Sequence, residues 1–372
     1  KSQRIMPGWV QVSPYFWMRH LDSVMSPVAP GLKVDATPFS ARLKGVQLSL
    51  SGMRFFDLET TGLSGGTGTV AFLATVGRFS SQALSSADDD SAAIDKSGTI
   101  DRFCTTQYFI DDYPGEPAMI QRLAADISEA QALVTYNGGS FDLPLFRTRC
   151  IMCGLQPPEI SRHLDLLTVA RRLWRVVLPD CSLGTVERRI LSIDRGPDLP
   201  GSAIPERWFS YLRGGEEAQE ALELVFSHND HDVRTLASLL LLLADGFGKS
   251  RVYLADPVGL AVILGRSSPE LALRTLESAV AEGEPRALKP LMRSYWKAGR
   301  RQDRMDLVPR LPEDSYGLYM KSVRAEKLEK DLDAAFGFVD QALAQASGSI
   351  ALRLEKRRKR LESLLMEKQP AN

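Results

Sequence analysis

The amino-acid sequence predicts an α/β domain, with a mixed sheet flanked by helices, followed by an all-α domain. Short apolar runs rich in aromatic and β-branched residues begin at Met53 and then alternate with helical patterns as far as Asp245. Beyond Pro257 the strand signals end and helical periodicity continues alone. The length of 372 residues also suits two or three domains.

Three successive strands open the α/β domain. Apolar runs bounded by turn residues predict strands at 53–59, 70–79 and 104–110. Residues 1–50 mix Pro, Ser and aromatic residues without periodicity, so we expect an irregular lead-in. Residues 80–101 are dominated by Ser, Ala and Asp, which cannot form a packed core, and we expect a flexible insert there.

Helices and one more strand complete this domain. Apolar residues at helical spacing predict a helix after Pro114, and a short apolar run predicts a strand at 132–136. Further helices are predicted at 143–153, 164–174, 183–190 and 216–243.

The last hundred residues read as amphipathic helices. Their predicted ranges are 270–280, 287–297, 316–328, 332–344 and 350–366. The fourth helix carries one apolar stripe with small residues between, which is typical of helical-hairpin repeats; a plain helical bundle is the alternative.

Composition excludes some classes of function. Forty-six Lys and Arg residues balance 46 Asp and Glu residues, so nucleic acid must be attracted by local patches, not by net charge. The longest apolar stretch, 239–244, is far shorter than the roughly 18 residues of a membrane span. With four cysteines in the chain, we expect a cytoplasmic protein that does not contact a membrane.

Two acidic residues share one face of the first predicted strand. The two-residue period of a strand places Asp57 and Glu59 on the same side. At about 4 Å and an effective dielectric near 20, two like charges repel by roughly 4 kcal/mol, so a proton or a cation must intervene. A divalent metal would meet this need; an acidic strand face in water is the alternative.

Two more acids stand at informative positions. Asp142 begins a helix after a strand and two glycines, where capping that helix is the alternative role. Asp232 interrupts the apolar face of the long helix, where an unpaired carboxylate would be costly. His228 lies one turn earlier on the same side, and a His–Asp pair within the helix is the alternative there.

Taken together, these motifs resemble the YprB-like predicted exonucleases of the ribonuclease-H-like DEDD exonuclease superfamily. The resemblance covers residues 52–245, about half of the chain. It rests on residues 57–73, Tyr136-Asn137-Gly138 with 141–145, 163–167 with 171–174, and His228-Asn229 with Asp232-Val233. The resemblance implies a ribonuclease-H-like domain over 51–246. Members of that family commonly carry helical repeats after it, which implies TPR-like repeats over 257–368.

The resemblance also implies a function and a catalytic set. The function is metal-dependent hydrolysis of nucleic acid, with a 3′–5′ exonuclease as the first expectation. Two divalent ions, Mg²⁺ or Mn²⁺, would be held by the four acids Asp57, Glu59, Asp142 and Asp232. His228 would be the general base. It lies four residues before Asp232, where the superfamily's histidine type has a spacing of five, so His231 remains a second candidate.

Nucleic-acid contacts are expected near these acids. Arg171, Arg172 and Arg175 follow one another on a predicted helix, where they form either a face for the phosphate backbone or a solvated surface. Thr60 and Asn137, in the matched motifs, are further candidates. The charge run at 356–360 is expected to be solvated.

Two rival functions remain open at this point. One is a catalytically silent nuclease-like scaffold whose helical repeats bind a protein partner. The other is an endonuclease on the same fold. Retention of all four acids favours the enzyme over the silent scaffold.

Overall fold

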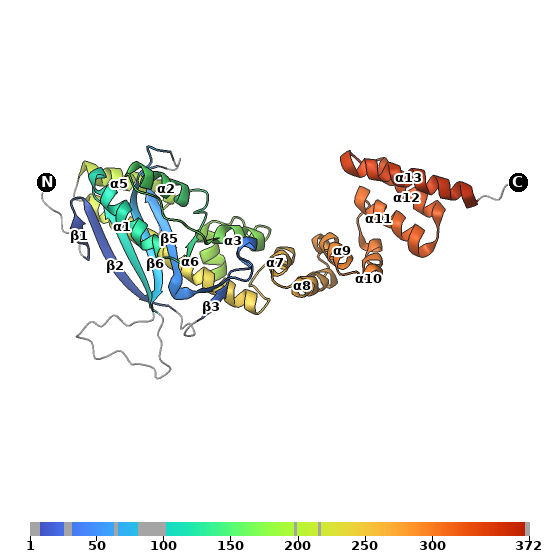
Figure 1. Ribbon diagram of the computed structural model, residues 1–372, viewed down its shortest axis with the longest axis horizontal. Coiled ribbons are helices and arrows are strands. Elements are labelled where there is room, and N and C mark those ends of the chain that lie inside the picture. The colour runs from blue at the N-terminus through green and yellow to red at the C-terminus, as the bar shows by residue number, and fades with distance from the viewer. Residues whose placement is uncertain are drawn as a thin grey trace, which may run out of the picture. The chain divides into compact units, whose positions relative to one another are not determined.

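The computed structural model describes residues 8–25, 32–62, 66–80, 102–196, 199–214 and 217–368. The chain divides into two compact units, Lys1–Ser268 and Pro269–Asn372 (Figure 1). The expected insert at 80–101 lies outside the described residues except for Ser80, which ends a strand.

A mixed sheet forms the centre of the first unit, and over the described residues it has seven strands in the order β1-β2-β7-β6-β5-β8-β9. The strands from β1 to β5 in that order pair antiparallel, whereas β5, β8 and β9 run parallel. Their bounds are β1 Val10–Ser13, β2 Phe16–Val24, β5 Met53–Thr60, β6 Ala71–Ser80, β7 Arg102–Ile110, β8 Ala132–Thr135 and β9 His163–Asp165. A separate hairpin joins β3 Lys33–Asp35 and β4 Gln47–Ser49.

Helices cover both faces of this sheet. On one face, Phe56 of β5 packs on Phe146 of α2, and the Tyr108 hydroxyl of β7 donates to Asp126 of α1. On the other face, α6 approaches so closely that a Cβ at Gly77 would lie 2.6 Å from Val233 Cγ1. The helices are α1 Glu116–Ser128, α2 Asp142–Met152, α3 Leu166–Trp174, α4 Leu183–Val186 with the π-helical η4 Glu187–Leu191, α5 Ile204–Arg213, α6 Glu217–Gly248 and α7 Pro257–Leu264.

This architecture confirms the predicted fold class, a mixed sheet flanked by helices and followed by a helical region. The irregular lead-in was wrong for residues 10–24, because β1 and β2 extend the sheet and β2 pairs along the whole of β7. The apolar residues at the start of β2 do not alternate with polar ones, because Phe16, Trp17 and Met18 are all buried. The strand is covered on both sides there, which removes the period-two signal.

The second compact unit begins at Pro269, later than the predicted boundary at residue 257. Helix α7 lies in the first unit, where its Gly259 packs against the backbone of Arg172 in α3. Its sequence, PVGLAVIL, is almost wholly apolar, which suits a short helix buried on several sides.

The second unit is built from helices over its described residues. They are α8 Pro269–Ala281, α9 Leu288–Lys297, α10 Arg301–Asp306, α11 Ser315–Arg324 with the π-helical η8 Ala325–Glu329, α12 Leu332–Leu343 and α13 Gly348–Lys368. Leu318, Val339 and Leu354, from α11, α12 and α13, share one core. Across both units, none of the helices in the described ranges is long and apolar enough to cross a membrane.

The basic run of α13 is only partly solvated. Arg357 and Arg360 both pair with Glu326, and Arg358 pairs with Asp340 at 2.7 Å. These ion pairs join α13 to η8 and α12, so much of this charge serves the packing of the helices.

Candidate functional site

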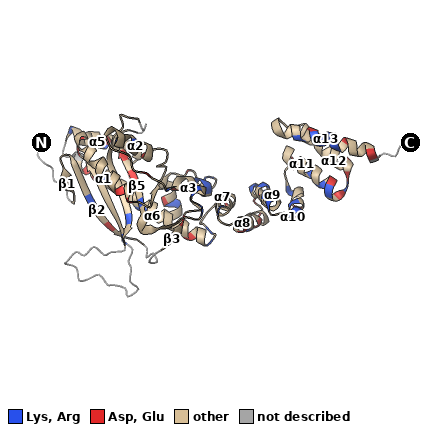
Figure 2. Ribbon diagram, viewed as in Figure 1, with Lys and Arg blue, Asp and Glu red and all other residues tan. Residues whose placement is uncertain are grey.

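Strand β5 presents two carboxylates on the side of the sheet that α6 covers. Asp57 and Glu59 are partly buried, whereas Phe56 and Leu58, which point to the other side, are fully buried. Figure 2 shows this acidic segment on β5. The strand lies between antiparallel β6 and parallel β8. Its residues 53–55 pair with β8, and Asp57 and Glu59 pair with Thr75 and Leu73 of β6, which fixes the positions of both carboxylates.

A buried chain of hydrogen bonds fixes the orientation of Asp57. Asn229 of α6 donates from Nδ2 to Asp57 Oδ2 at 2.6 Å. The hydroxyl of Thr75 donates to Asn229 Oδ1, which forces the amide nitrogen of Asn229 toward the carboxylate. Gln107 then donates from Nε2 to Thr75 Oγ1 at 3.1 Å and to the Phe226 carbonyl at 2.9 Å.

The electrostatic surroundings of Asp57 are unfavourable for a negative charge. Burial raises the pKa of Asp57 well above its usual value. The charges of three neighbours raise it further, and the Asn229 hydrogen bond only partly opposes them. Those neighbours are Asp232, Asp142 and Glu59. Three of the predicted acids therefore act on the fourth, Asp57, in the folded chain.

Asp142 is buried at the start of α2. The cap position belongs to Phe141, which makes no side-chain cap, so Asp142 does not serve as the N-cap residue that we weighed as its alternative. The side chain is almost inaccessible, and burial raises its pKa to about 7, with the charge of Asp165 adding to the effect. A carboxyl group of this kind exchanges its proton near neutral pH.

Asp232 is neutralised by an arginine that the sequence analysis did not single out. Arg195 Nη2 lies 2.5 Å from Asp232 Oδ1, and Arg195 Nε lies 2.5 Å from Glu187 Oε2. Thr235 holds Glu187 from the other side, with its hydroxyl donating to Oε1 at 2.6 Å. His228 Nε2 is 3.6 Å from Asp232 Oδ2, one helical turn away as predicted. The His–Asp pair that we weighed as an alternative therefore exists, but Arg195 is the closer partner.

The two candidate bases differ in their surroundings. The side chains of His228 and Asp232 are 14% and 18% exposed, so both are largely shielded from water. His231 is also partly buried, but within the described ranges it forms no ion pair and no hydrogen bond. His228 has the better-placed acidic partner, and its role as base stays a prediction.

Three further motif residues shape the loops around the acids. Thr60 is buried and its hydroxyl donates to the Gly62 carbonyl at 2.8 Å, so it holds the loop after β5 instead of facing a ligand. Asp165 caps α3 through Leu167 N and accepts from Asn137 N at 2.9 Å, which gives it a structural role. Asn137 is exposed, with the left-handed φ of 66° that this turn requires.

Thr75, Gln107 and Arg195 were missed from the sequence. Thr75 lies opposite Asp57 in register and Gln107 lies opposite Thr75, and both are completely buried. A polar side chain in an otherwise apolar strand was the available signal, because such a group needs a buried partner. Arg195 lies in a loop and carried no comparable signal.

The described residues contain no group of three His, Cys, Asp or Glu side chains arranged to hold a metal ion. We expected the four acids at metal-bridging distance, and that arrangement is absent from this part of the chain. One oxygen of Asp57 accepts from Asn229 and one oxygen of Asp232 pairs with Arg195, so each of these oxygens is already engaged. The donor set itself fits a divalent cation, since it supplies hard oxygen ligands and a buried carboxyl whose neighbours carry like charges.

Two comparisons with known proteins cover the part of the chain that carries these residues. A family model described as RNase_H superfamily matches residues 54–244, just over half of the chain. The matched range contains all four acids and both histidines. The chain is also 34% identical over 189 residues to the uncharacterized protein YprB of Bacillus subtilis (strain 168). That match spans 50% of this chain and 40% of the relative.

Proposed function

Because the chain belongs to the RNase_H superfamily, we propose that the acids around Asp57 form the active site of a metal-dependent nuclease. The observation that carries the proposal is the partly buried Asp57 carboxyl, whose pKa is raised by burial and by three other carboxylates. A stable fold does not require four acids in one place. A site that binds cations does, because the cation removes the repulsion.

The four acids that would bind the metal come from three different elements of the fold. We infer that Asp57 and Glu59 would offer ligands from β5, with Asp142 from α2 and Asp232 from α6 completing the set. Two Mg²⁺ or Mn²⁺ ions bound there would stabilise the attacking and leaving oxygens of a phosphodiester. Asn229, backed by Thr75 and Gln107, keeps the Asp57 carboxylate in one orientation.

The chain's own proton chemistry centres on His228. We infer that His228 accepts a proton from the attacking water, and that Asp232, 3.6 Å from Nε2, stabilises the imidazolium that results. Arg195 pairs with both Asp232 and Glu187, and this bridge fixes the orientation of the Asp232 carboxylate.

The finer assignment is a 3′–5′ exonuclease of the DEDD type that uses two metals. It is supported by the order of the acids along the chain and by the motifs shared with the YprB-like proteins. We also propose that the α8–α13 helices form TPR-like repeats that bind a protein partner or guide the nucleic acid. The packing of α11, η8, α12 and α13 in one core supports this arrangement for the last part of the unit.

One observation favours a second candidate, the catalytically silent scaffold. Arg195 already compensates Asp232, and a chain that never binds metal would be stabilised by such a pair. In that case the helical unit would carry the function. Activity measurements separate the two candidates.

The test is hydrolysis of end-labelled single- and double-stranded DNA and RNA with Mg²⁺, Mn²⁺ or EDTA. We expect metal-dependent shortening from the 3′ end by the wild type and none by Asp57→Asn. Asp245→Asn, on an exposed turn of the same α6, is the matched control and should retain activity. Internal cuts would favour the endonuclease, and inactivity on all four substrates would favour the scaffold.

A further inference from the structure

The cleft between α3 and α7 is lined by arginines without acidic partners. Its volume is about 250 Å³, and Arg171, Arg172 and Arg175 contribute to its wall together with Val176 and Val262. We propose that this arginine cleft binds backbone phosphates of a single-stranded nucleic acid that occupies the acidic site. The proposal rests on the nuclease function above and assigns the path of the strand.

The cleft carries more positive than negative charge, with three arginines and one carboxylate, Asp256, in its lining. Across the described residues, Arg171, Arg172 and Arg175 form no ion pair and no side-chain hydrogen bond. Other arginines of this unit are paired, for example Arg149 with Glu116 and Arg54 with Asp126. In a chain of zero net charge, an unpaired basic cluster creates a local field that attracts phosphate.

A fourth arginine adds to this field. Arg266 donates from Nη1 to the Pro38 carbonyl at 2.5 Å. Its pKa is lowered, first by burial and then by the charge of Arg172, so the two cations lie close enough to act on each other. The acidic member of the lining, Asp256, uses Oδ2 to accept from Gly259 N at 3.0 Å and thereby caps α7.

The cleft has firm walls. Asp256 N donates to the Leu173 carbonyl at 2.7 Å, and Trp174 Nε1 donates to the Tyr253 carbonyl at 3.0 Å. Gly259 packs so tightly that a Cβ there would lie 1.9 Å from the Arg172 carbonyl oxygen. Helix α3 is thus bound to the start of α7 at several points, and the arginines project from a fixed base.

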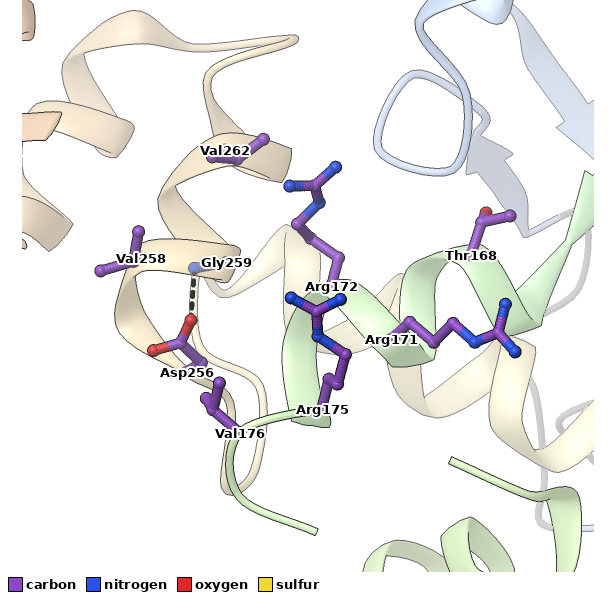
Figure 3. A pocket seen from close by; sticks show the side chains of 9 residues that line it. All are labelled: Thr168, Arg171, Arg172, Arg175, Val176, Asp256, Val258, Gly259 and Val262. Atoms are coloured by element: carbon purple, nitrogen blue, oxygen red, sulfur yellow. Dashed lines mark hydrogen bonds between the residues drawn. The ribbon is translucent and has the colours of Figure 1, made fainter. Parts of the chain in front are cut away.

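The directions of the arginines connect the cleft with the acidic site. Figure 3 shows Arg172 and Arg175 extending toward α7, whereas Arg171 points away from that helix. Burial raises the pKa of Tyr136; among the smaller influences the charge of Arg171 lowers it and the charge of Asp165 raises it, so both charges lie near Tyr136. Asp165 in turn raises the pKa of Asp142, a member of the acidic site. Asp165 also caps α3 through Leu167 N, so this helix, at which Figure 2 shows a blue basic segment, reaches from the edge of the site to the cleft.

The chemistry of the cleft fits a nucleic-acid strand. Guanidinium groups bind phosphate oxygens through two parallel hydrogen bonds, which is the pairing that arginine favours over lysine. Val176 and Val262 are about half exposed beside the arginines and offer an apolar surface to a sugar or base. A single strand can follow both surfaces because its bases are not paired.

The test is binding of labelled 20-nucleotide single-stranded DNA and RNA in EDTA, measured by fluorescence anisotropy at several salt concentrations. We compare the full chain with Arg172→Gln/Arg175→Gln and with Arg42→Gln/Arg251→Gln, a double change at exposed arginines outside the cleft. The cleft variant should bind about ten-fold more weakly or worse, and its slope of log affinity against log salt should fall by about 1.4, as expected for two lost phosphate contacts. Arg172→Lys/Arg175→Lys keeps the charge and should recover most of that slope.

Several outcomes would overturn the proposal. They are no binding by the wild type, equal weakening in both glutamine variants, and binding of inorganic phosphate or a mononucleotide with no gain from a longer strand. Because binding is measured without metal, these results are independent of hydrolysis. A chain that binds strands through the cleft yet cleaves nothing would refute the proposed nuclease and leave the cleft standing.

Discussion

Two carboxylate sites in this chain meet opposite surroundings. Glu326 in the second unit pairs with Lys327, Arg357 and Arg360, and although burial acts to raise its pKa, these partners lower it overall. Asp57 in the first unit is also shielded from water, but burial and the charges of neighbouring acids both raise its pKa. Glu326 is surrounded by positively charged partners, whereas Asp57 is surrounded by other carboxylates.

Under the proposed function, this difference is the one expected between a structural site and a metal-binding site. An acid surrounded by cations from neighbouring helices holds those helices together and needs nothing further. An acid surrounded by acids is stable only with a proton or a bound cation, which is the condition that a metal site exploits. Asp232, paired with Arg195, lies between the two cases.

Removing Asp57 should have the largest effect on activity. We expect Asp57→Asn to lower the hydrolysis rate by at least about 10²–10³-fold, because the site loses an electrostatic stabiliser of the transition state. The metal-free variant should unfold at the same or a higher temperature than the wild type, because one repelling charge is gone. Full activity, or a strongly lowered unfolding temperature, would contradict this account of the site.

His228 sharpens the comparison within the acidic site. If it is the base, His228→Ala should lower the rate by about 10²–10⁴-fold with metal affinity nearly unchanged. If it only positions Asp232, metal affinity should fall by about 10–100-fold and added Mn²⁺ should restore the rate. Rates measured against metal concentration distinguish these results. His231→Ala is the matched control, and a loss confined to that variant would move the base to His231.

The Glu326 site should respond through stability. Glu326→Gln removes the negative partner of Arg357, whose side chain is largely buried. We therefore expect the free energy of unfolding of the helical unit to fall by about 3 kcal/mol. Hydrogen exchange of α11–α13 measures this change. Glu329→Gln breaks the more exposed pair with Arg324 and should change the same quantity by less than about 1 kcal/mol. Equal effects would mean that Glu326 is not the organising charge.

Asp142 should give a dependence of stability on pH and not a change confined to one condition. Its raised pKa of about 7 means that the folded state binds more protons than the unfolded state between about pH 4 and 7. The free energy of unfolding of metal-free protein should therefore fall as pH rises through this window, by up to about 1.4 kcal/mol per pH unit. Asp142→Asn should make this slope shallower. If the dependence of unfolding free energy on pH, measured by urea titration, is the same in Asp142→Asn as in the wild type, a group other than Asp142 takes up the proton.

The sequence predicted most of the fold because its strongest signals are local. The apolar runs of β5, β6 and β7 and the long periodic helix α6 carry their own patterns. Strand β2 and helix α7 were not anticipated, because both are buried by neighbours distant in sequence and so lack the one-sided pattern of an exposed element. In the site, the two-residue spacing of Asp57 and Glu59 was enough to predict that both carboxylates share one face of a strand. The pairing of Arg195 with Asp232 could not be predicted, because only folding brings the Arg195 loop to α6.

The most direct test of the central claim is calorimetric titration of the metal-free chain with Mn²⁺. We expect that the wild type binds two ions, that binding releases protons below about pH 7 and strengthens as pH rises toward that value, and that Asp57→Asn loses this binding. Asp245→Asn should bind as the wild type does. A wild type that binds no Mn²⁺, or an Asp57→Asn variant that binds it unchanged, would contradict the claim that these acids form a metal site.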